Sequence, residues 1–232
     1  MMSTKGSSHT PVDPLDTEYL VRDYFLEQLN RKGYLWCSHR AFTLDFAANE
    51  SPNNLRVNEN KRREMCASIC SLSNDFLSCF GPKIVKMCER LSLPSPSSSN
   101  STIDSIGYQL FKNVADELFR EGINWDHILT LFVFSSELAF HNAASKGHPS
   151  MVDDIMGWLC RYLNENILQW IADQGGWETF ILYANGIDEV DSAFFRSRRN
   201  SCMGKFLFVA GSLGLLGAIA VACLLFIAKK FS

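Results

Sequence analysis

The sequence predicts an all-α protein, a helical bundle around a central hydrophobic helix, followed by a C-terminal transmembrane helix. Apolar residues recur at spacings of three and four along the body of the chain, without the alternation typical of strands. Residues 128–140 are apolar on nearly every face, and residues 206–228 carry no charge. A helix that is apolar all round belongs either in the centre of a bundle or in a membrane.

The composition fits one cytosolic domain with a sizeable core. The chain has 232 residues, a net charge of −3 and 47% hydrophobic residues, and it lacks the basic excess of a general nucleic-acid binder. Its eight cysteines include no CxxC pair and no zinc-like spacing, so we expect reduced thiols and no metal or other cofactor. Cys66 and Cys70, four residues apart, would lie one helical turn from each other.

The N-terminal part of the chain predicts a disordered segment, one helix and a loop. Residues 1–15 lack the apolar core of a signal peptide. A first helix is expected over residues 17–32, with Asp16 as its N-cap and Gly33 as its end. Its apolar face would consist of Leu20, Val21, Tyr24, Phe25 and Leu29. Residues 38–60 are polar and predict a loop.

The next segment predicts two helices separated by a Gly-Pro break. The second helix would begin near residue 61, with a helical stripe at spacings of four, three and four, and end at Gly81 and Pro82. A short third helix would carry Ile84, Met87 and Leu91, before a Ser/Pro-rich loop at residues 92–102.

The fourth helix and the central helix are predicted on either side of a short turn. Residues 103–120 place Leu110, Phe111, Val114 and Leu118 on one face. Gly122 would end this helix, and Asn124 would cap the central helix over residues 125–141.

The bundle is predicted to close with a long helix and a short one. Ser150 with Asp153 resembles a capping box that opens a helix through residue 170. Gly175 and Gly176 would break that helix, and a short last helix would follow from Trp177. We therefore expect the bundle to occupy residues 16–184.

Residues 206–228 predict a transmembrane tail anchor, joined to the bundle by a polar linker at residues 185–205. A helix of this length spans about 34 Å, enough to cross a hydrocarbon core. Basic residues flank it on both sides, so their distribution does not set its orientation. Since the span lies near the end of the chain, we expect insertion after translation, with the bundle left in the cytosol.

Four segments in order, with the tail anchor, resemble the Bcl-2 family of apoptosis regulators. ELFREGINW, residues 117–125, is similar to the first homology motif, and WIADQGGWETF, residues 170–180, to the second. The stretch 18–36, which ends in RKGYLW, resembles the fourth motif of pro-survival members. A stripe on the second predicted helix resembles the third motif, which is the family's death-motif helix. This stripe contains Met65, Ile69, Leu72, Asn74, Asp75 and Phe76.

The resemblance implies a surface groove that binds the amphipathic helix of a pro-apoptotic relative, a helix-in-groove mode. It also implies contact with a lipid membrane, and it allows homo- or heterodimers. Any one of the matching residues could equally be ordinary core. As a set they are the expected groove: Phe76, Phe80, Ile84, Met87, Leu118, Asn124, Trp125, His127, Leu129 and Phe134.

The predicted groove departs from the family after Asn124 and Trp125, where Asp126 and His127 replace the usual Gly-Arg. The usual Arg pairs with an acidic residue of the incoming helix, whereas histidine is mostly neutral at pH 7. We hypothesise that this groove favours less acidic helices and binds acidic ones better below about pH 6.5. The alternative is that both residues are solvated at the helix start, with Asp126 at its positive end. Tyr183 is expected to miss the family's usual groove position.

The expected function is pro-survival, by sequestration of pro-apoptotic relatives at the cytosolic face of the mitochondrial outer membrane or of the endoplasmic reticulum. GYLW and WETF favour this class, whereas IMGW and DQGGW are equally similar to members that perforate the membrane, which is the first alternative. A tail-anchored helical adaptor unrelated to cell death is the second. No GxSxG, HExxH, phosphate-loop or dinucleotide motif suggests an enzyme.

Overall fold

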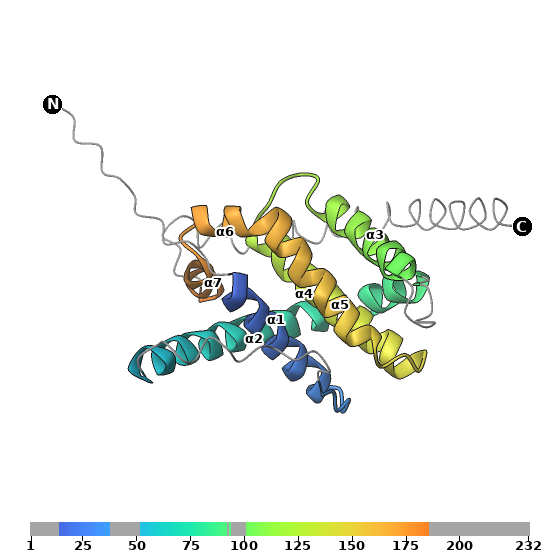
Figure 1. Cartoon of the computed structure of the whole chain (residues 1–232), viewed down its shortest axis with the longest axis horizontal. Helices are drawn as coiled ribbons and strands as arrows, with labels where there is room; N and C mark the ends of the chain where they lie inside the picture. Colours follow the sequence, from blue (N-terminus) through green and yellow to red (C-terminus); the bar gives the residue numbers. More distant parts are fainter. Residues whose placement is uncertain (1–13, 38–51, 92, 94–100, 186–232) are drawn as a thin grey trace, which may run out of the picture.

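The computed structural model describes residues 14–37, 52–91, 93 and 101–185, which form helices and no strand (Figure 1). The main helices are α1 (Pro14–Arg31), α2 (Pro52–Arg90), α3 (Ser101–Leu118) and α4 (Trp125–Phe140). They are followed by α5 (Met151–Tyr162), α6 (Leu168–Asp173) and α7 (Trp177–Ala184). Two π-helical segments, η2 (His141–Ser145) and η3 (Leu163–Ile167), follow α4 and α5 directly. The all-helical prediction is therefore confirmed for this part of the chain.

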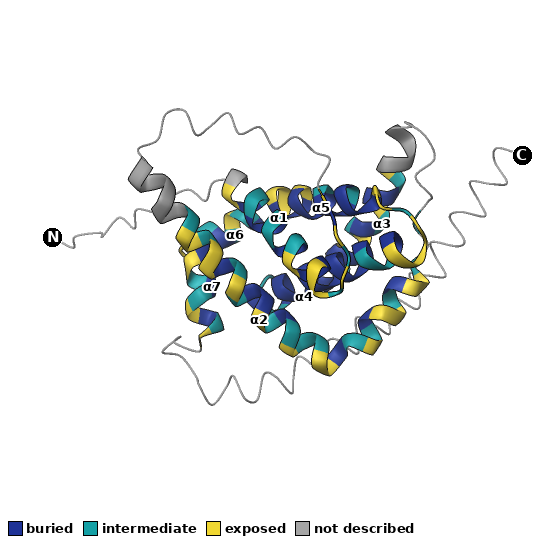
Figure 2. Ribbon diagram, turned by 90° about the horizontal axis from the view of Figure 1, so that it is seen from below, coloured by how far each residue is buried: buried dark blue, intermediate teal, exposed yellow. Residues whose placement is uncertain are grey.

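Helix α4 is the centre of the bundle, as its composition predicts. Every residue from His127 to Ala139 is buried, and α1, α2, α3 and α5 pack around it (Figure 2). Its hydroxyl side chains form hydrogen bonds within the helix. The hydroxyl groups of Thr130, Ser135 and Ser136 donate to carbonyls of the preceding turn, at 2.7, 2.6 and 3.1 Å. Such bonds within the helix let it carry hydroxyl groups inside a dry core.

Helix α1 packs against α2, α4 and α5 through its predicted apolar face. Leu20, Val21, Tyr24, Phe25 and Leu29 are all buried. The helix starts earlier than predicted, at Pro14, a residue suited to the first helical position. Asp16 therefore lies within the first turn, and the prediction that it precedes the helix as N-cap is wrong. Gly33 follows the helix with φ +75, a conformation that favours glycine.

The predicted break at Gly81 and Pro82 is wrong, because α2 runs through both residues to Arg90. Phe80, Ile84 and Cys88 are buried at spacings of four, so one apolar stripe continues past the proline. Pro82 itself is exposed. A proline removes one backbone hydrogen bond and bends a helix. Because Pro82 lies on the solvent face, burial of the apolar stripe outweighs the loss of this hydrogen bond. The helix bends in its second half (Figure 2). Its start at Pro52 also overturns the predicted loop over residues 52–60.

The predicted capping box at Ser150 and Asp153 is not formed. Ser150 has helical backbone angles and makes no side-chain cap hydrogen bond. The N–H groups of Met151 and Val152 already donate to the carbonyls of His148 and Pro149, so Ser150 lies within a turn and not ahead of it. The predicted long helix continues from α5 through η3 into α6, and Gly175 and Gly176 end it with positive φ, as expected.

Several sequence predictions fall outside the described residues. They are the disordered N-terminus at residues 1–13, most of the loop before α2, most of the Ser/Pro-rich loop, the linker and the anchor at residues 206–228. Among the helices that the structure describes, none has the length and apolar character needed to cross a membrane.

Candidate partner-binding surface

The chain's own third-motif stripe faces into the bundle. Met65 and Ile69 on α2 are buried, whereas Leu72, Asn74 and Phe76 are half-buried and Asp75 is exposed. Between them, Ser73 is buried and accepts a hydrogen bond of 3.1 Å from the Tyr24 hydroxyl of α1. Burial raises the pKa of Tyr24, so this hydroxyl stays protonated as a donor. The apolar start of the motif is thus committed to the chain's own core.

Further along α2, four predicted groove residues form a continuous row, which we call the α2 row: Phe76, Phe80, Ile84 and Met87. The rings of Phe76 and Phe80 lie 4.9 Å apart, centroid to centroid. Phe80 and Ile84 are buried, but Phe76 and Met87 remain half-buried against the core. The row therefore presents apolar atoms both to the core and to solvent.

The other predicted groove residues lie on α3 and around α4, and most of them are covered. Leu118, Trp125, His127 and Leu129 each keep only 7–8% of their surface exposed, and Phe134 keeps 3%. Asn124 is half-buried. Phe134 lies beside Phe111 of α3, with ring centroids 6.3 Å apart. Direct contact of a partner with most of this set therefore requires the helices above it to move.

Asn124 caps α4 as predicted, and it also fixes His127. Its side-chain oxygen accepts from the backbone N–H of His127 at 2.8 Å. The ring nitrogen Nδ1 of His127 lies 2.9 Å from the carbonyl oxygen of Gly122, and the ring packs edge-on against Phe119. The alternative that His127 is a solvated helix-start residue is therefore wrong, since its ring is buried against this turn.

Asp126 is bonded within the bundle. Its carboxylate accepts a hydrogen bond from the hydroxyl of Tyr183 on α7. Tyr183 is buried, and its ring lies 6.5 Å from that of Trp125. This hydrogen bond links the first turn of α4 to α7. The Asp126 carboxylate, which was expected to face a partner, is therefore bonded within the bundle.

Trp125 belongs to an aromatic cluster at the end of the bundle. Its ring centroid lies 4.9 Å from that of Trp170 on α6 and 5.4 Å from that of Phe180 on α7. Trp177 lies 6.2 Å away, and its indole N–H donates to Thr17 of α1 at 3.0 Å. The Trp residues of the first and second motifs therefore hold α4, α6, α7 and α1 together.

Polar contacts hold α3 on α5 and η3. The Tyr162 hydroxyl donates to Asp116 at 3.1 Å, and the Tyr108 hydroxyl donates to Glu165 at 2.9 Å. Burial and the adjacent Glu165 raise the pKa of Tyr108 to about 12. Arg161 and the Tyr108 hydroxyl hold the pKa of Glu165 below its usual value. The two tyrosines and their carboxylate partners lie far apart in the chain, so periodicity could not have revealed these bonds.

The comparisons with known proteins establish the family. Residues 57–177 match the model of the apoptosis regulator proteins of the Bcl-2 family, and this chain belongs to that family. It is 36% identical over 113 residues to human Bcl-2-like protein 1, which covers 48% of this chain and 47% of that protein. The chain thus spans about half the length of the curated relatives it matches first.

Two further proteins are also similar to this chain. It is 40% identical over 76 residues to the apoptosis regulator BAX of Bos taurus, covering 32% of this chain and 39% of that protein. Among solved structures, it is similar to Trichoplax adhaerens trBcl-2L2, crystallised bound to trBak BH3. That likeness has a TM-score of 0.55 and 27% identity, and it covers 73% of this chain and 97% of that one. The fold of the described residues is therefore the Bcl-2 fold.

Proposed function

We propose that this chain is a pro-survival regulator that sequesters the amphipathic death-motif helix of pro-apoptotic relatives. The observation that carries the proposal is the division of α2 into two parts. Its own third-motif residues Met65 and Ile69 are buried, whereas Phe76 and Met87 remain half-buried with apolar atoms exposed. A chain arranged in this way is suited to receive a helix and not to donate one. The Trichoplax protein of similar fold, bound to trBak BH3, supports the same mode.

The partner helix is expected to enter where the α2 row meets the residues beneath it. Phe80, Ile84, Leu129 and Phe134 are buried, so the second half of α2 must shift before a partner can reach them. Apolar burial contributes about 25 cal/mol per Å², less the cost of ordering the peptide. A required movement slows association, so we expect an association rate at or below the ordinary range of about 10⁵–10⁷ M⁻¹s⁻¹.

The proposed location is the cytosolic face of the mitochondrial outer membrane, with the endoplasmic reticulum as the alternative. The uncharged stretch at residues 206–228 supports a tail anchor, and residues 185–205 would link it to the bundle. An anchor shared with the partner's membrane raises the effective concentration of the two proteins.

A dye-release assay tests the function directly. Liposomes of mitochondrial lipid would receive a perforating relative, with and without the full chain. We expect the full chain to block release, and the Leu129→Glu and Met87→Glu variants to lose the block. Met87 is half-buried and so tolerates a charge better than Leu129. The matched control is Leu182→Glu, because Leu182 lies on α7 with 46% of its surface exposed.

The second candidate function is membrane perforation, favoured by the similarity to BAX. In the same assay, dye release by this chain alone after addition of a third-motif peptide would establish that function and overturn the proposal. A third outcome would exclude both functions. If the chain neither blocks dye release nor causes it, and binds no third-motif peptide, a helical adaptor unrelated to cell death replaces both candidate functions.

The hypothesis about His127 stays a prediction. The His127→Arg variant should bind an acidic third-motif peptide more tightly than the wild type does, because a guanidinium can pair with the carboxylate. Peptide affinities measured by calorimetry at pH 6 and pH 7.5 would decide it. An unchanged affinity would show that the buried ring plays no part in recognition.

A further inference from the structure

Three cations follow the α2 row along one side of the helix, and we call them the basic edge: Lys83, Lys86 and Arg90. Residues three, four and seven apart share a face of a helix. Lys83 lies three residues after Phe80 and four before Met87, so it stands in the same stripe as the α2 row. Arg90 continues that stripe three residues after Met87. Lys86 lies one turn from each of the other two cations.

The basic edge is open to solvent, and its charge is not neutralised from within. Lys86 and Arg90 are exposed and Lys83 is half-buried, on the half of α2 that runs along the margin of the bundle (Figure 2). The Lys83 ammonium lies 5.8 Å from the centroid of the Phe80 ring, a cation–π distance. Among the described residues, no carboxylate forms an ion pair with these three side chains. Glu89 lies about two and a half turns after Phe80, so it faces the opposite side of α2.

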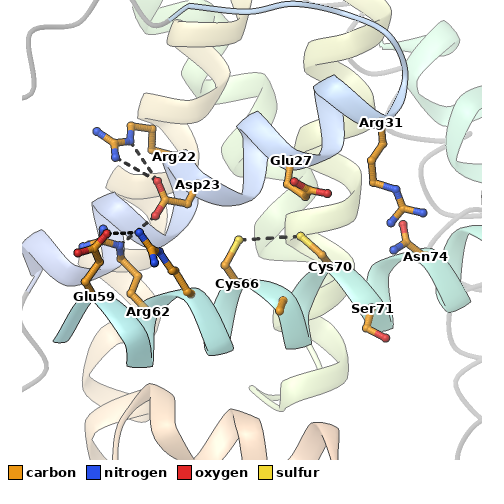
Figure 3. A pocket seen from close by; sticks show the side chains of 12 residues that line it. Arg22, Asp23, Glu27, Arg31, Glu59, Arg62, Cys66, Cys70, Ser71 and Asn74 are labelled. Carbon is orange, nitrogen blue, oxygen red and sulfur yellow. Dashed lines mark hydrogen bonds and ion pairs between the residues drawn. The ribbon is translucent and has the colours of Figure 1, made fainter. Parts of the chain in front are cut away.

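Cations in the pocket between α1 and α2 provide the contrast, because most of them have partners within the chain (Figure 3). Arg22 and Arg62 both donate to the carboxylate of Asp23, at 3.1 and 2.9 Å. Arg63, which lines the same pocket, pairs with Glu59 one turn earlier on α2. The basic edge lacks such partners, so its charge is available to a molecule that binds from outside.

The two titratable side chains in the first turn of α4 are engaged within the bundle. The Asp126 carboxylate accepts from Tyr183, and the buried His127 ring lies against the carbonyl of Gly122. Charged recognition of a partner helix therefore falls to the α2 side of the surface. A set of unpaired cations beside an apolar row is complementary to an amphipathic helix that carries carboxylates along one flank.

We propose that the basic edge selects partner helices by charge, by binding carboxylates spaced three and four residues apart on the flank of the partner helix that faces α2. The inference rests on the proposed function, because the same surface must first accept a helix. Carboxylates one turn apart on one helix can meet cations one turn apart on another. Lys83, half-buried beside an aromatic ring, should contribute most to affinity. Lys86 and Arg90 lie at the exposed rim and act chiefly on the association rate.

Calorimetry on the full chain in detergent, with a third-motif peptide in three charge versions, tests the inference. All versions keep one apolar face, and the positions beside it carry glutamine on both flanks, glutamate on one flank, or glutamate on the other. We expect one glutamate version, and only one, to bind about 10-fold more tightly than the glutamine version, because exposed ion pairs each contribute roughly 2- to 5-fold. An increase from roughly 0.1 M to 1 M salt should remove most of this gain, since the Debye length falls from about 10 to about 3 Å.

Charge reversal on α2 locates the contact. Lys83→Glu should abolish the gain of the favoured glutamate version and leave the affinity for the glutamine version within about 2-fold of the wild type. A peptide with lysine on that same flank should then bind Lys83→Glu more tightly than it binds the wild type. Lys86→Glu and Arg90→Glu should each lower the gain by roughly 2- to 5-fold. The matched control is Lys61→Glu, the same change in the first half of α2 at a side chain that is 52% exposed, and it should leave all affinities unchanged.

The outcomes separate this inference from the proposed function. If the glutamine version binds but neither glutamate version gains, only the inference about the basic edge is overturned. The same holds if the gain survives in the Lys83→Glu/Lys86→Glu/Arg90→Glu variant, since the carboxylates are then bound elsewhere. If no version binds the wild type, the surface accepts no helix, and the proposed function fails together with the inference. Binding of the glutamine version by a variant shows that the variant is folded.

Discussion

At the scale of single residues, buried polar side chains tie α1 to distant parts of the chain. Thr17 accepts from the Trp177 indole, and Tyr24 donates to Ser73 on α2. The Tyr24 hydroxyl also lies 3.4 Å from that of Ser136 on α4, and its ring packs edge-on against Phe132. The Tyr24 side chain thus links three helices. In the sequence, the helical stripe identifies Tyr24 only as an apolar position.

Removal of this hydroxyl should therefore destabilise the fold. We expect Tyr24→Phe to lower the free energy of unfolding by about 1–2 kcal/mol, because Ser73 and Ser136 lose a buried partner. The matched control is Tyr34→Phe, since Tyr34 is half-buried and contacts Phe140 through its ring alone. Urea unfolding of both variants is the measurement. Equal losses in the two variants would contradict the role given to the Tyr24 hydroxyl.

His141 makes stability depend on pH. Burial, and then the nearby Lys146, lower its pKa in the folded state, against Glu89. In the unfolded chain a histidine takes up a proton near pH 6.5. Below that value the unfolded state binds more protons than the folded state, so stability falls as the pH falls toward the lowered folded pKa. We expect the stability of His141→Gln to fall less than that of the wild type between pH 7 and 5.5. Parallel urea titrations would refute this if the two proteins lose stability equally.

At the scale of elements, patterns in the sequence predicted where most helices lie, and tertiary packing decided some of their boundaries. Glycines at positive φ end α1, α3 and α6 near the predicted positions. The predicted break at Gly81 and Pro82 was wrong because these residues only weaken a helix locally. They do not specify whether the apolar stripe of the helix is buried beyond them. The buried Phe80, Ile84 and Cys88 decided that boundary.

Two helical glycines allow a paired test of element packing. A Cβ on Gly107 of α3 would lie 2.5 Å from the Trp158 ring of α5, whereas a Cβ on Gly81 meets nothing within 4 Å. We expect Gly107→Ala to destabilise the protein by about 1–3 kcal/mol through overpacking. Gly81→Ala should instead stabilise it by about 0.5–1 kcal/mol. Thermal unfolding measures both, and Trp158→Phe should partly rescue Gly107→Ala. Stabilisation by both alanines would rule out the close approach of α3 to α5.

At the scale of the whole molecule, a buried carboxylate lies within the hydrophobic centre. Glu137 of α4 is 4% exposed, and its Oε2 accepts from Lys32 at the end of α1. Lys32 also lies over the ring of Phe140, 4.5 Å from its centroid. The other oxygen, Oε1, has no hydrogen-bond partner in the described part of the chain. This partly buried ion pair is therefore one of the contacts that hold the end of α1 on the central helix.

Loss of that cation should be costly. We expect Lys32→Met to lower the free energy of unfolding by about 2–3 kcal/mol, less than the roughly 3–5 kcal/mol of a fully buried pair, because Lys32 remains 25% exposed. The control is Lys61→Met, whose pair with Glu178 is 52% and 63% exposed. Such surface pairs contribute less than about 1 kcal/mol. If chemical denaturation shows the same loss of unfolding free energy in both variants, Glu137 is neutralised or solvated in the folded protein.

The sequence by itself determined the fold class, the central helix, the apolar face of α1 and the cap of α4 by Asn124. These features depend on residues close together in the chain, so periodicity and capping chemistry reveal them. Only the tertiary structure decided which candidate groove residues are covered, and that His127 and Asp126 are bonded to Gly122 and Tyr183. It also decided that the stripe of α2 continues through a proline. Those outcomes depend on contacts between residues far apart in the sequence, and no local pattern encodes such contacts.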